Sequence, residues 1–372
     1  MNLNKTVHIV CLDAPCPADY GGAIDMFCKI KTLAQSGVSV LLHYFHYRPE
    51  RHAEGVLKDC AQVFSYKRKR FLSSLPFSKP HIVASRINNE LIVRLNADDH
   101  PILLEGVHCA GIIPYLKNRA RNIVVRLQND EAVYYRRLAE TEKNFFKSSY
   151  YRWESFLLKK YQHSLPKNIR YAAVSQRDID LFRHQHGLRH IDLIPSFTPW
   201  QEDRPLPGIG TYCLYHGNLT VAENKRAVSW LIRHVFSRLK VPLYIAGKNI
   251  PENLKRAAKY LTHISFFSNP DEPAMAKLIR EAHIHVLPDF NNTGLKLKFL
   301  HALFMGRFCI TNKPDVPADN TVIVAQTPDA YIQSIKILMR REFDADAAAE
   351  RVHMLRFYSN ERNAEKLNAL LW

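Results

Sequence analysis

The 372-residue chain lacks the features of several large protein classes. It contains no uninterrupted apolar run of about 18 residues, the length that a membrane-spanning helix needs. Its seven cysteines include no Cys-x-x-Cys pair, and zinc sites usually depend on such close pairs. We therefore predict buried free thiols and a reducing, cytoplasmic location.

Signatures of several enzyme classes are missing as well. The sequence has no Gly-x-Gly-x-x-Gly, no Walker A motif and no serine-hydrolase or kinase signature. Asp178-Ile179-Asp180 matches the Asp-x-Asp pattern of metal-dependent transferases. However, it lies in a predicted helix (residues 175–186), in which side chains two positions apart point away from each other. We therefore predict no required metal and no bound cofactor.

Acidic residues are outnumbered: 52 Lys and Arg face 35 Asp and Glu, a net charge of +17. Residues 1–200 hold 29 of the basic residues against 18 acidic ones, and Lys67-Arg68-Lys69-Arg70 forms a run. Such a charge attracts nucleic acid, anionic lipid headgroups or phosphorylated substrates, unless it is only a solvated basic surface. Because no nucleic-acid-binding module is recognisable, we expect the chain not to bind nucleic acid. From the basic charge of the first half, we expect peripheral contact with the inner face of a membrane.

Apolar runs alternate with amphipathic stretches in the first half of the chain. Residues 7–13, 38–45, 102–105 and 122–127 read as buried strands, and residues 23–35 carry apolar side chains at helical spacing before Gly37. Alternation of this kind predicts an α/β fold with a parallel sheet that is covered by helices on both faces.

Prolines and glycines crowd into residues 195–210, where we place an interdomain linker. The alternation then restarts. Strands are predicted at 212–216, 242–246, 283–287 and 308–311, and helices at 221–238, 252–260 and 295–305, with one or two more in 345–371. The predicted domains are 1–200, 201–345 and a helical tail, 346–372, that packs back toward the first domain. Two doubly wound domains would face a central cleft and bind ligands at the carboxyl ends of their strands.

Candidate site residues follow the strands of the first half. Gly21 and Gly22 open the first helix, where backbone N–H groups favour an anion. Glu105-Gly106-Val107-His108 and Arg126-Leu127-Gln128-Asn129-Asp130 end two neighbouring strands. His108, Glu105, Arg126, Asn129 and Asp130 could bind a sugar hydroxyl, or could serve local hydrogen bonding.

Glycines with polar or cationic neighbours also follow the strands of the second half, as phosphate binding requires. They are Gly217 with Asn218, before Lys225, and Gly247 with Lys248. The segment from Thr293 to His301 is the most informative: Thr293 and Gly294 can start a helix, and Lys296 or Lys298 can add charge for a diphosphate. The alternative is an amphipathic helix with exposed lysines.

These segments resemble the GT-B glycosyltransferases, specifically the retaining glycosyltransferase family 4 of bacterial polysaccharide assembly. The resemblance covers nearly the whole chain. It rests on the order of Tyr20-Gly21-Gly22, Glu105 to His108, Val174-Ser175, Tyr215 to Leu219, Ile245 to Gly247, and Gly294 to Gly306. It implies a nucleotide-sugar donor as co-substrate, a glycan or lipid-linked acceptor, and retention of the anomeric configuration.

The resemblance also implies roles. His108 would lie beside the reacting sugar, with Ser175 near the cleft. The donor would be bound by three groups of residues: Gly21 and Gly22; Gly217, Asn218, Lys225, Gly247 and Lys248; and Thr293, Gly294, Lys296, Lys298 and His301. In the expected mechanism, Lys298 and the Gly217 turn stabilise the leaving diphosphate, and the acceptor hydroxyl attacks on the same face of the sugar.

Three features depart from the family pattern. Asn218 stands where the family has a phosphate-binding arginine, and His301 stands where it has a glutamate that binds the ribose. The first glutamate of the family's Glu-x7-Glu motif is also missing, with Asn292 nearby. The alternative is therefore a catalytically degenerate GT-B protein that binds nucleotide or sugar without turnover. The segment 150–160, which mixes aromatic, apolar and basic residues, reads as a helix packed in the core or, less favoured, as an amphipathic surface helix.

Overall fold

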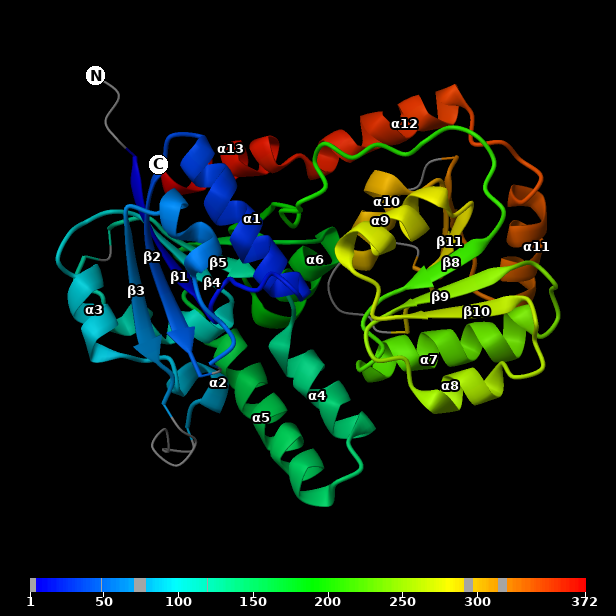
Figure 1. Cartoon of the computed structure of the whole chain (residues 1–372). Helices are drawn as coiled ribbons and strands as arrows, with labels where there is room; N and C mark the ends of the chain where they lie inside the picture. The colour runs from blue at the N-terminus through cyan, green and yellow to red at the C-terminus, as the bar shows by residue number, and fades with distance from the viewer. Residues whose placement is uncertain (1–4, 48, 70–77, 119, 291–296, 314–319) are drawn as a thin grey trace. The chain divides into compact units, whose positions relative to one another are not determined.

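The computed structural model describes residues 5–47, 49–69, 78–118, 120–290, 297–313 and 320–372. The chain divides into two compact units. The described residues up to Pro199, together with Tyr358–Trp372, form one unit, and those from Trp200 to Phe357 form the other. We call them the N-terminal and C-terminal units, and each is built around a parallel sheet (Figure 1).

The N-terminal unit has a seven-stranded parallel sheet in the order β3-β2-β1-β4-β5-β6-β7. The strands are β1 (Thr6–Cys11), β2 (Ser39–His46), β3 (Gln62–Lys67), β4 (Ile102–Glu105), β5 (Ile123–Leu127), β6 (Arg170–Ala173) and β7 (Ile191–Leu193). The helices are α1 (Gly21–Gln35), α2 (His81–Ala84), α3 (Asn89–Leu95), α4 (Glu131–Thr141), α5 (Phe145–His163), α6 (Gln176–His186) and α13 (Asn360–Leu371), with 3-10 helices at Glu54–Asp59 and Val107–Tyr115.

The C-terminal unit has a six-stranded parallel sheet in the order β10-β9-β8-β11-β12-β13. The strands are β8 (Cys213–His216), β9 (Leu243–Gly247), β10 (Ile264–Ser268), β11 (Ile284–Val286), β12 (Phe308–Thr311) and β13 (Val322–Val324). The helices are α7 (Ala222–Trp230), α8 (Glu252–Ala257), α9 (Glu272–Glu281), α10 (Leu297–Met305), α11 (Pro328–Leu338) and α12 (Ala345–Leu355), with a π-helical turn at Leu231–Phe236 and a 3-10 turn at Arg356–Tyr358.

The central strands are apolar on both faces because helices cover both sides of each sheet. In β1, Val7 and Ile9 join one buried cluster and Val10 joins another. Near-continuous apolar runs of this kind are expected where a parallel strand is buried on both faces. The prediction of two doubly wound α/β domains is therefore confirmed.

The C-terminal tail divides between the units. Helix α12 belongs to the C-terminal unit, where the buried Arg351 guanidinium donates to the carbonyl oxygens of Leu303 and Arg307 at 3.1 and 3.0 Å. Helix α13 lies against α1 and buries Leu367 and Leu371 in the core of the N-terminal unit. Only α13 of the predicted tail packs on the first domain.

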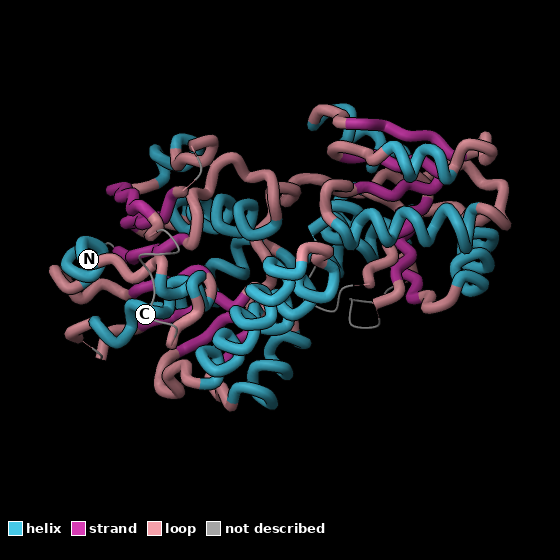
Figure 2. The backbone as a smooth tube through the Cα atoms, turned by 90° about the horizontal axis from the view of Figure 1, so that it is seen from below, coloured by secondary structure: helices cyan, strands magenta, loops and turns pink. Residues whose placement is uncertain are grey.

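Helices α4 and α5 form an antiparallel hairpin that extends beyond the sheet of the N-terminal unit (Figure 1). Figure 2 shows the chain from below, with its helices and strands in different colours. One face of α5 is buried through Leu157 and Leu158, as predicted for a helix packed in the core. The other face keeps Trp153 and Phe156 about half exposed, with 46% and 48% of their surface accessible. Both readings of this segment therefore describe part of the helix.

Candidate functional site

Two glycine turns meet at the carboxyl ends of β8 and β9 in the C-terminal unit. Gly217 N donates to Ala246 O at 3.1 Å, and Leu219 N donates to Lys248 O at 3.1 Å. A Cβ on Gly247 would lie 1.8 Å from Gly217 O, so only glycine permits this close approach. Gly217 has a φ of +153°, a conformation that also favours glycine.

Lys298 reaches these turns from α10. Its Nζ donates to Tyr215 Oη and to Asn224 Oδ1, both at 2.8 Å, and it lies 4.7 Å from the centre of the Tyr215 ring. Asn224 in turn donates from Nδ2 to Asn218 O at 2.7 Å. A Cβ on Gly217 would lie 3.7 Å from Lys298 Cδ, so the ammonium-bearing side chain passes directly over the glycine turn. We call this group the Lys298 cluster: Tyr215, Gly217, Asn218, Asn224 and Lys298.

His301 lies one helical turn beyond Lys298. Its ring stacks on Trp200, with centroids 4.1 Å apart and planes 9° from parallel, and meets His216 edge-on at 5.6 Å. Burial lowers the pKa of His301 to about 3. Burial, aided by His301, His285 and Lys298, holds the pKa of His216 well below its usual range. Both rings are therefore neutral at pH 7, and His301 cannot replace the charge of a carboxylate.

The other donor-side predictions are more scattered. Asn218 is exposed, and its Oδ1 accepts from the N–H and hydroxyl of Thr220 at 3.0 and 2.7 Å, so the side chain shapes the turn. Lys225 is half-buried on α7, and Lys248 is exposed after β9. Thr293, Gly294 and Lys296 lie outside the described residues.

In the N-terminal unit, Gly21 and Gly22 form the first turn of α1. Within the described residues there, the helix start has neither a side-chain cap nor an acidic side chain in its first turn, an arrangement that favours an anion. A Cβ on Gly22 would lie 2.9 Å from Gln128 Oε1. Glycine therefore lets the helix start approach the loop that follows β5.

His108 is placed by a glycine and faces a buried carboxyl group. Gly106 has a φ of +78°, and a Cβ there would lie 2.8 Å from His108 Nδ1. His108 Nε2 lies 4.0 Å from Glu131 Oε2, and the two side chains are 14% and 10% exposed. Burial, with Arg86 and Arg68 nearby, holds the pKa of His108 well below its usual range.

Glu131, at the start of α4, was not predicted as a site residue. Burial, aided by the charge of Asp130, raises its pKa to about 8, although Arg86 and a hydrogen bond from Asn129 act in the opposite sense. At pH 7 the pair is therefore a neutral imidazole beside a mostly protonated carboxyl group. Perturbed groups that meet at the carboxyl edge of a sheet are typical of functional sites.

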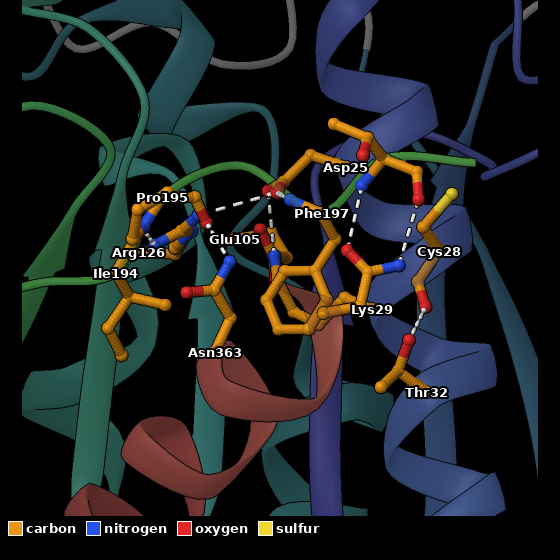
Figure 3. A network of polar contacts seen from close by, with 12 residues as sticks. Asp25, Cys28, Lys29, Thr32, Glu105, Arg126, Ile194, Pro195, Phe197 and Asn363 are labelled. Atoms are coloured by element: carbon orange, nitrogen blue, oxygen red, sulfur yellow. Dashed lines mark hydrogen bonds and ion pairs between the residues drawn. The ribbon is translucent and has the colours of Figure 1, made fainter. Parts of the chain in front are cut away.

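Glu105 and Arg126 belong to a buried ion network (Figure 3). Lys29 Nζ donates to Glu105 Oε1 at 2.6 Å and to Asp25 Oδ2 at 2.8 Å, and Arg126 donates to Pro195 O at 2.9 Å and also bonds Ile194 O. Neither Glu105 nor Arg126 has exposed surface. Their bonds tie α1, β4 and β5 to the segment after β7, so the geometry favours a structural role over contact with an acceptor.

Asp130 and Ser175 cap helices. Asp130 Oδ1 accepts from Val133 N at 2.9 Å, and its Oδ2 lies 3.1 Å from His186 Nε2. Ser175 caps α6 and donates to Asp178 Oδ2 at 2.6 Å. Such caps contribute roughly 1 kcal/mol each to stability. The sugar-side role of both residues stays a prediction.

Trp200, Tyr215, Asn224 and Glu131 were missed as site residues. Tyr215 lies within the quoted motif, and Asn224 lies one position before Lys225. Trp200 falls in the proline-rich linker, where nothing local indicates a stacking partner 101 positions away. In the described part of the chain, no group of three or more His, Cys, Asp or Glu side chains could hold a metal ion, and no helix there is long and apolar enough to cross a membrane.

The sequence of the chain is similar to those of known proteins. The family model described as "Glycosyl transferases group 1" matches residues 210–341, within the C-terminal unit. An uncharacterized 44.6 kDa protein in the cps region of Klebsiella pneumoniae is 25% identical over 324 residues, which cover 82% of each chain.

Solved structures match over nearly the whole chain. Sucrose-phosphate synthase from Thermosynechococcus elongatus superposes with a TM-score of 0.69 at 15% identity, covering 98% of both chains. TarM of S. aureus, in a complex that contains UDP, superposes with a TM-score of 0.64 at 10% identity over 99% of both. The chain has the GT-B fold. Within this GT-B chain, the Lys298 cluster and the His108–Glu131 pair lie in different units, each at the carboxyl edge of its sheet.

Proposed function

We propose that the chain is a glycosyltransferase that takes a sugar from a nucleotide-diphosphate donor and transfers it to a hydroxyl group. The C-terminal unit is the donor unit in this proposal. It matches the group 1 glycosyltransferase family, and a structural neighbour with the same fold is solved in complex with UDP.

The observation that carries the proposal is the Lys298 cluster. The Lys298 ammonium group donates to the amide oxygen of Asn224, the Asn224 amide donates to the carbonyl oxygen of Asn218, and the Lys298 side chain passes over the glycine turn. A diphosphate that leaves the sugar gains negative charge, and a fixed cation beside backbone that can approach closely stabilises that charge. Lys298 would then supply the positive charge for the diphosphate that the family's arginine supplies at the position of Asn218.

For the N-terminal unit, we propose that His108 binds the transferred sugar. Its neutral imidazole can hydrogen-bond a sugar hydroxyl, and the mostly protonated carboxyl group of Glu131, 4.0 Å away, adds no charge beside the ring. We propose retention of configuration, no metal requirement, and a glycan or lipid-linked saccharide as acceptor. The relative in a cps region and the sugar ligands in the TarM complex support a saccharide as acceptor.

The test is turnover of a panel of UDP-, GDP-, ADP- and CMP-sugars, with and without EDTA. Glycosyltransferases commonly hydrolyse their donor slowly when no acceptor is present. Release of one nucleotide should therefore exceed release of the others. EDTA should not change this release, because the proposed reaction requires no metal. His108→Asn should lower this release by roughly 100-fold, the lower end of the loss expected when one hydrogen-bond donor to the transition state is removed. Glu140→Gln, at an exposed position on α4, should not lower it.

A second candidate function is a GT-B protein that binds a nucleotide without turnover. The observation that favours it is His301, whose neutral ring stacks on Trp200 where the family pattern has a carboxylate. If the wild-type protein binds a nucleotide but releases no nucleotide from any sugar donor, this second function is established and the proposal of a glycosyltransferase is refuted.

A further inference from the structure

Two arginines lie at the carboxyl edge of the N-terminal sheet, the edge that also carries His108. Arg68 follows β3 directly, and its Nε donates to Ser85 Oγ at 2.9 Å. Arg86 follows Ser85 in the chain, and its Nε donates to Leu12 O, just beyond β1, at 2.8 Å. Ser85 ends helix α2, which lies beside the carboxyl end of β3 (Figure 1). We call Arg68 and Arg86 the arginine pair.

The arginine pair has no counter-charge in the part of the chain that the structure describes. There, neither guanidinium forms an ion pair, and Nη1 and Nη2 of Arg68 donate no hydrogen bond. Arg86 is only 4% exposed, and its Nη1 donates to the carbonyl oxygen of Ile82 at 2.6 Å. Burial and the charge of Arg68 lower the pKa of Arg86 to about 10. A buried cation without a charged partner is unfavourable, so the arrangement favours binding of an anion.

Two carboxyl groups near the arginine pair leave its charge in place. Burial raises the pKa of Glu131 to about 8, against the effect of Arg86, so this group is mostly protonated at pH 7. Glu154 accepts a hydrogen bond from Ile82 N at 3.0 Å, and burial raises its pKa as well, against the effect of Arg68. The described contacts pair neither carboxyl group with a guanidinium. The positive charge of the arginine pair therefore stays unbalanced.

Neutral groups fix the orientation of Arg68. Its guanidinium carbon lies 5.0 Å from the centre of the Tyr47 ring, just after β2, and its Nε is bonded to Ser85. The remaining Nη1 and Nη2 form the planar fork that binds two oxygens of one phosphate. A phosphomonoester carries a charge of about −1.5 to −2 at pH 7, which balances two guanidinium groups better than the single charge of a carboxylate.

His108 links the arginine pair to the transferred sugar. Burial, together with Arg86 and Arg68, holds the pKa of His108 well below its usual range. The pair therefore lies within electrostatic reach of the ring that we propose binds the transferred sugar. An anion on the pair would lie near the hydroxyl group that accepts this sugar.

We propose that the arginine pair binds a phosphate group of the acceptor, so that the acceptor substrate is a phosphomonoester. Arg68 contacts two phosphate oxygens through Nη1 and Nη2, and the anion offsets the charge of Arg86. The inference deepens the proposed function and rests on it for the term acceptor, whereas binding of a phosphomonoester is measured without a donor. A failure of sugar transfer and a failure of phosphate binding are therefore seen in separate experiments.

The experiment is isothermal calorimetry of the full-length protein with glucose 1-phosphate and with hexyl phosphate, in the absence of nucleotide. The wild type should bind at least one of them, and Arg68→Gln should weaken this binding at least tenfold, the loss of one charged hydrogen bond. Lys69→Gln removes a charge from the next, exposed position and should bind as the wild type. Tighter binding of glucose 1-phosphate identifies a sugar phosphate, tighter binding of hexyl phosphate identifies a phosphate on a hydrocarbon chain, and both results support the proposal.

Thermal unfolding separates ligand binding from a structural role of Arg68. The phosphomonoester that binds should raise the Tm of the wild type but not that of Arg68→Gln. If Arg68→Gln is less stable than the wild type by the same amount with and without this ligand, Arg68 is structural and the proposal is overturned.

Three calorimetric results would also overturn it. Neither phosphomonoester binds the wild type, or Lys69→Gln loses as much affinity as Arg68→Gln, or glucuronate, which carries a carboxylate, binds as tightly as the phosphomonoester. A loss of phosphomonoester binding in Lys298→Met, with none in Arg68→Gln, would place the phosphate in the Lys298 cluster and contradict the proposal in the same way.

Discussion

Replacing Glu131 by glutamine should change how the stability of the protein depends on pH. In the folded state, burial raises the pKa of Glu131 to about 8, whereas the ordinary value for glutamate is 4.5. Between these two values the folded protein holds a proton that the unfolded chain has lost. Raising the pH across this range therefore lowers the free energy of unfolding of the wild type, and the glutamine variant lacks this contribution.

The size of the effect follows from the shift. One pH unit within the window is worth at most about 1.4 kcal/mol. From about pH 5.5 to about pH 7.5, the stability of Glu131→Gln relative to the wild type should therefore rise by about 2 kcal/mol. Urea unfolding at several pH values measures this difference, and other titrating groups cancel because both proteins contain them.

The control is Glu140→Gln, on an exposed position of the same helix. Its stability should follow that of the wild type at every pH. Parallel pH profiles for the wild type and Glu131→Gln would refute the reasoning, because they would mean that Glu131 ionises normally in the folded state and does not pair with His108 as a neutral group.

Two further substitutions each test the interior of one unit, the first in the C-terminal unit and the second in the N-terminal unit. Gly247→Ala should destabilise the protein by about 3 kcal/mol, the upper end of the usual cost of overpacking, because the added Cβ lies 1.8 Å from the backbone oxygen of Gly217. Gly37→Ala meets no atom within 4 Å, so it should show only the smaller cost of its positive φ. Equal urea midpoints for the two variants would contradict this account. Lys29→Met should cost about 3–5 kcal/mol, because it leaves Glu105 buried without its cation and leaves Asp25 paired with Arg126 alone. Lys31→Met on the same helix is the control, and a similar loss in both would indicate a general effect on α1.

Much of the fold could be predicted from the sequence. Strands buried on both faces have a distinctive composition, and β4 and β12 were predicted to the residue. Ends set by backbone hydrogen bonds were less exact: a strand was predicted at residues 7–13, whereas β1 runs from Thr6 to Cys11.

The site was less predictable because position along a strand does not determine what a side chain contacts. Glu105 follows β4 as a ligand-binding residue would, yet Lys29 from α1 captures it in the core. Glu131 follows the predicted cluster directly, and only the fold brings it to His108. The sequence predicted where the strands end, whereas tertiary contacts decide which side chains at those ends are buried.

The central claim is that the Lys298 cluster binds the diphosphate of a nucleotide donor, and isothermal calorimetry with UDP, GDP, ADP and CMP tests it most directly. One nucleoside diphosphate should bind the wild type, and Lys298→Met should weaken it by about 10- to 100-fold, the loss of one charged hydrogen bond. Lys259→Met, at an exposed position of the same unit, should bind as the wild type. Unchanged nucleotide affinity in folded Lys298→Met, or no binding of any nucleotide to the wild type, would contradict the account.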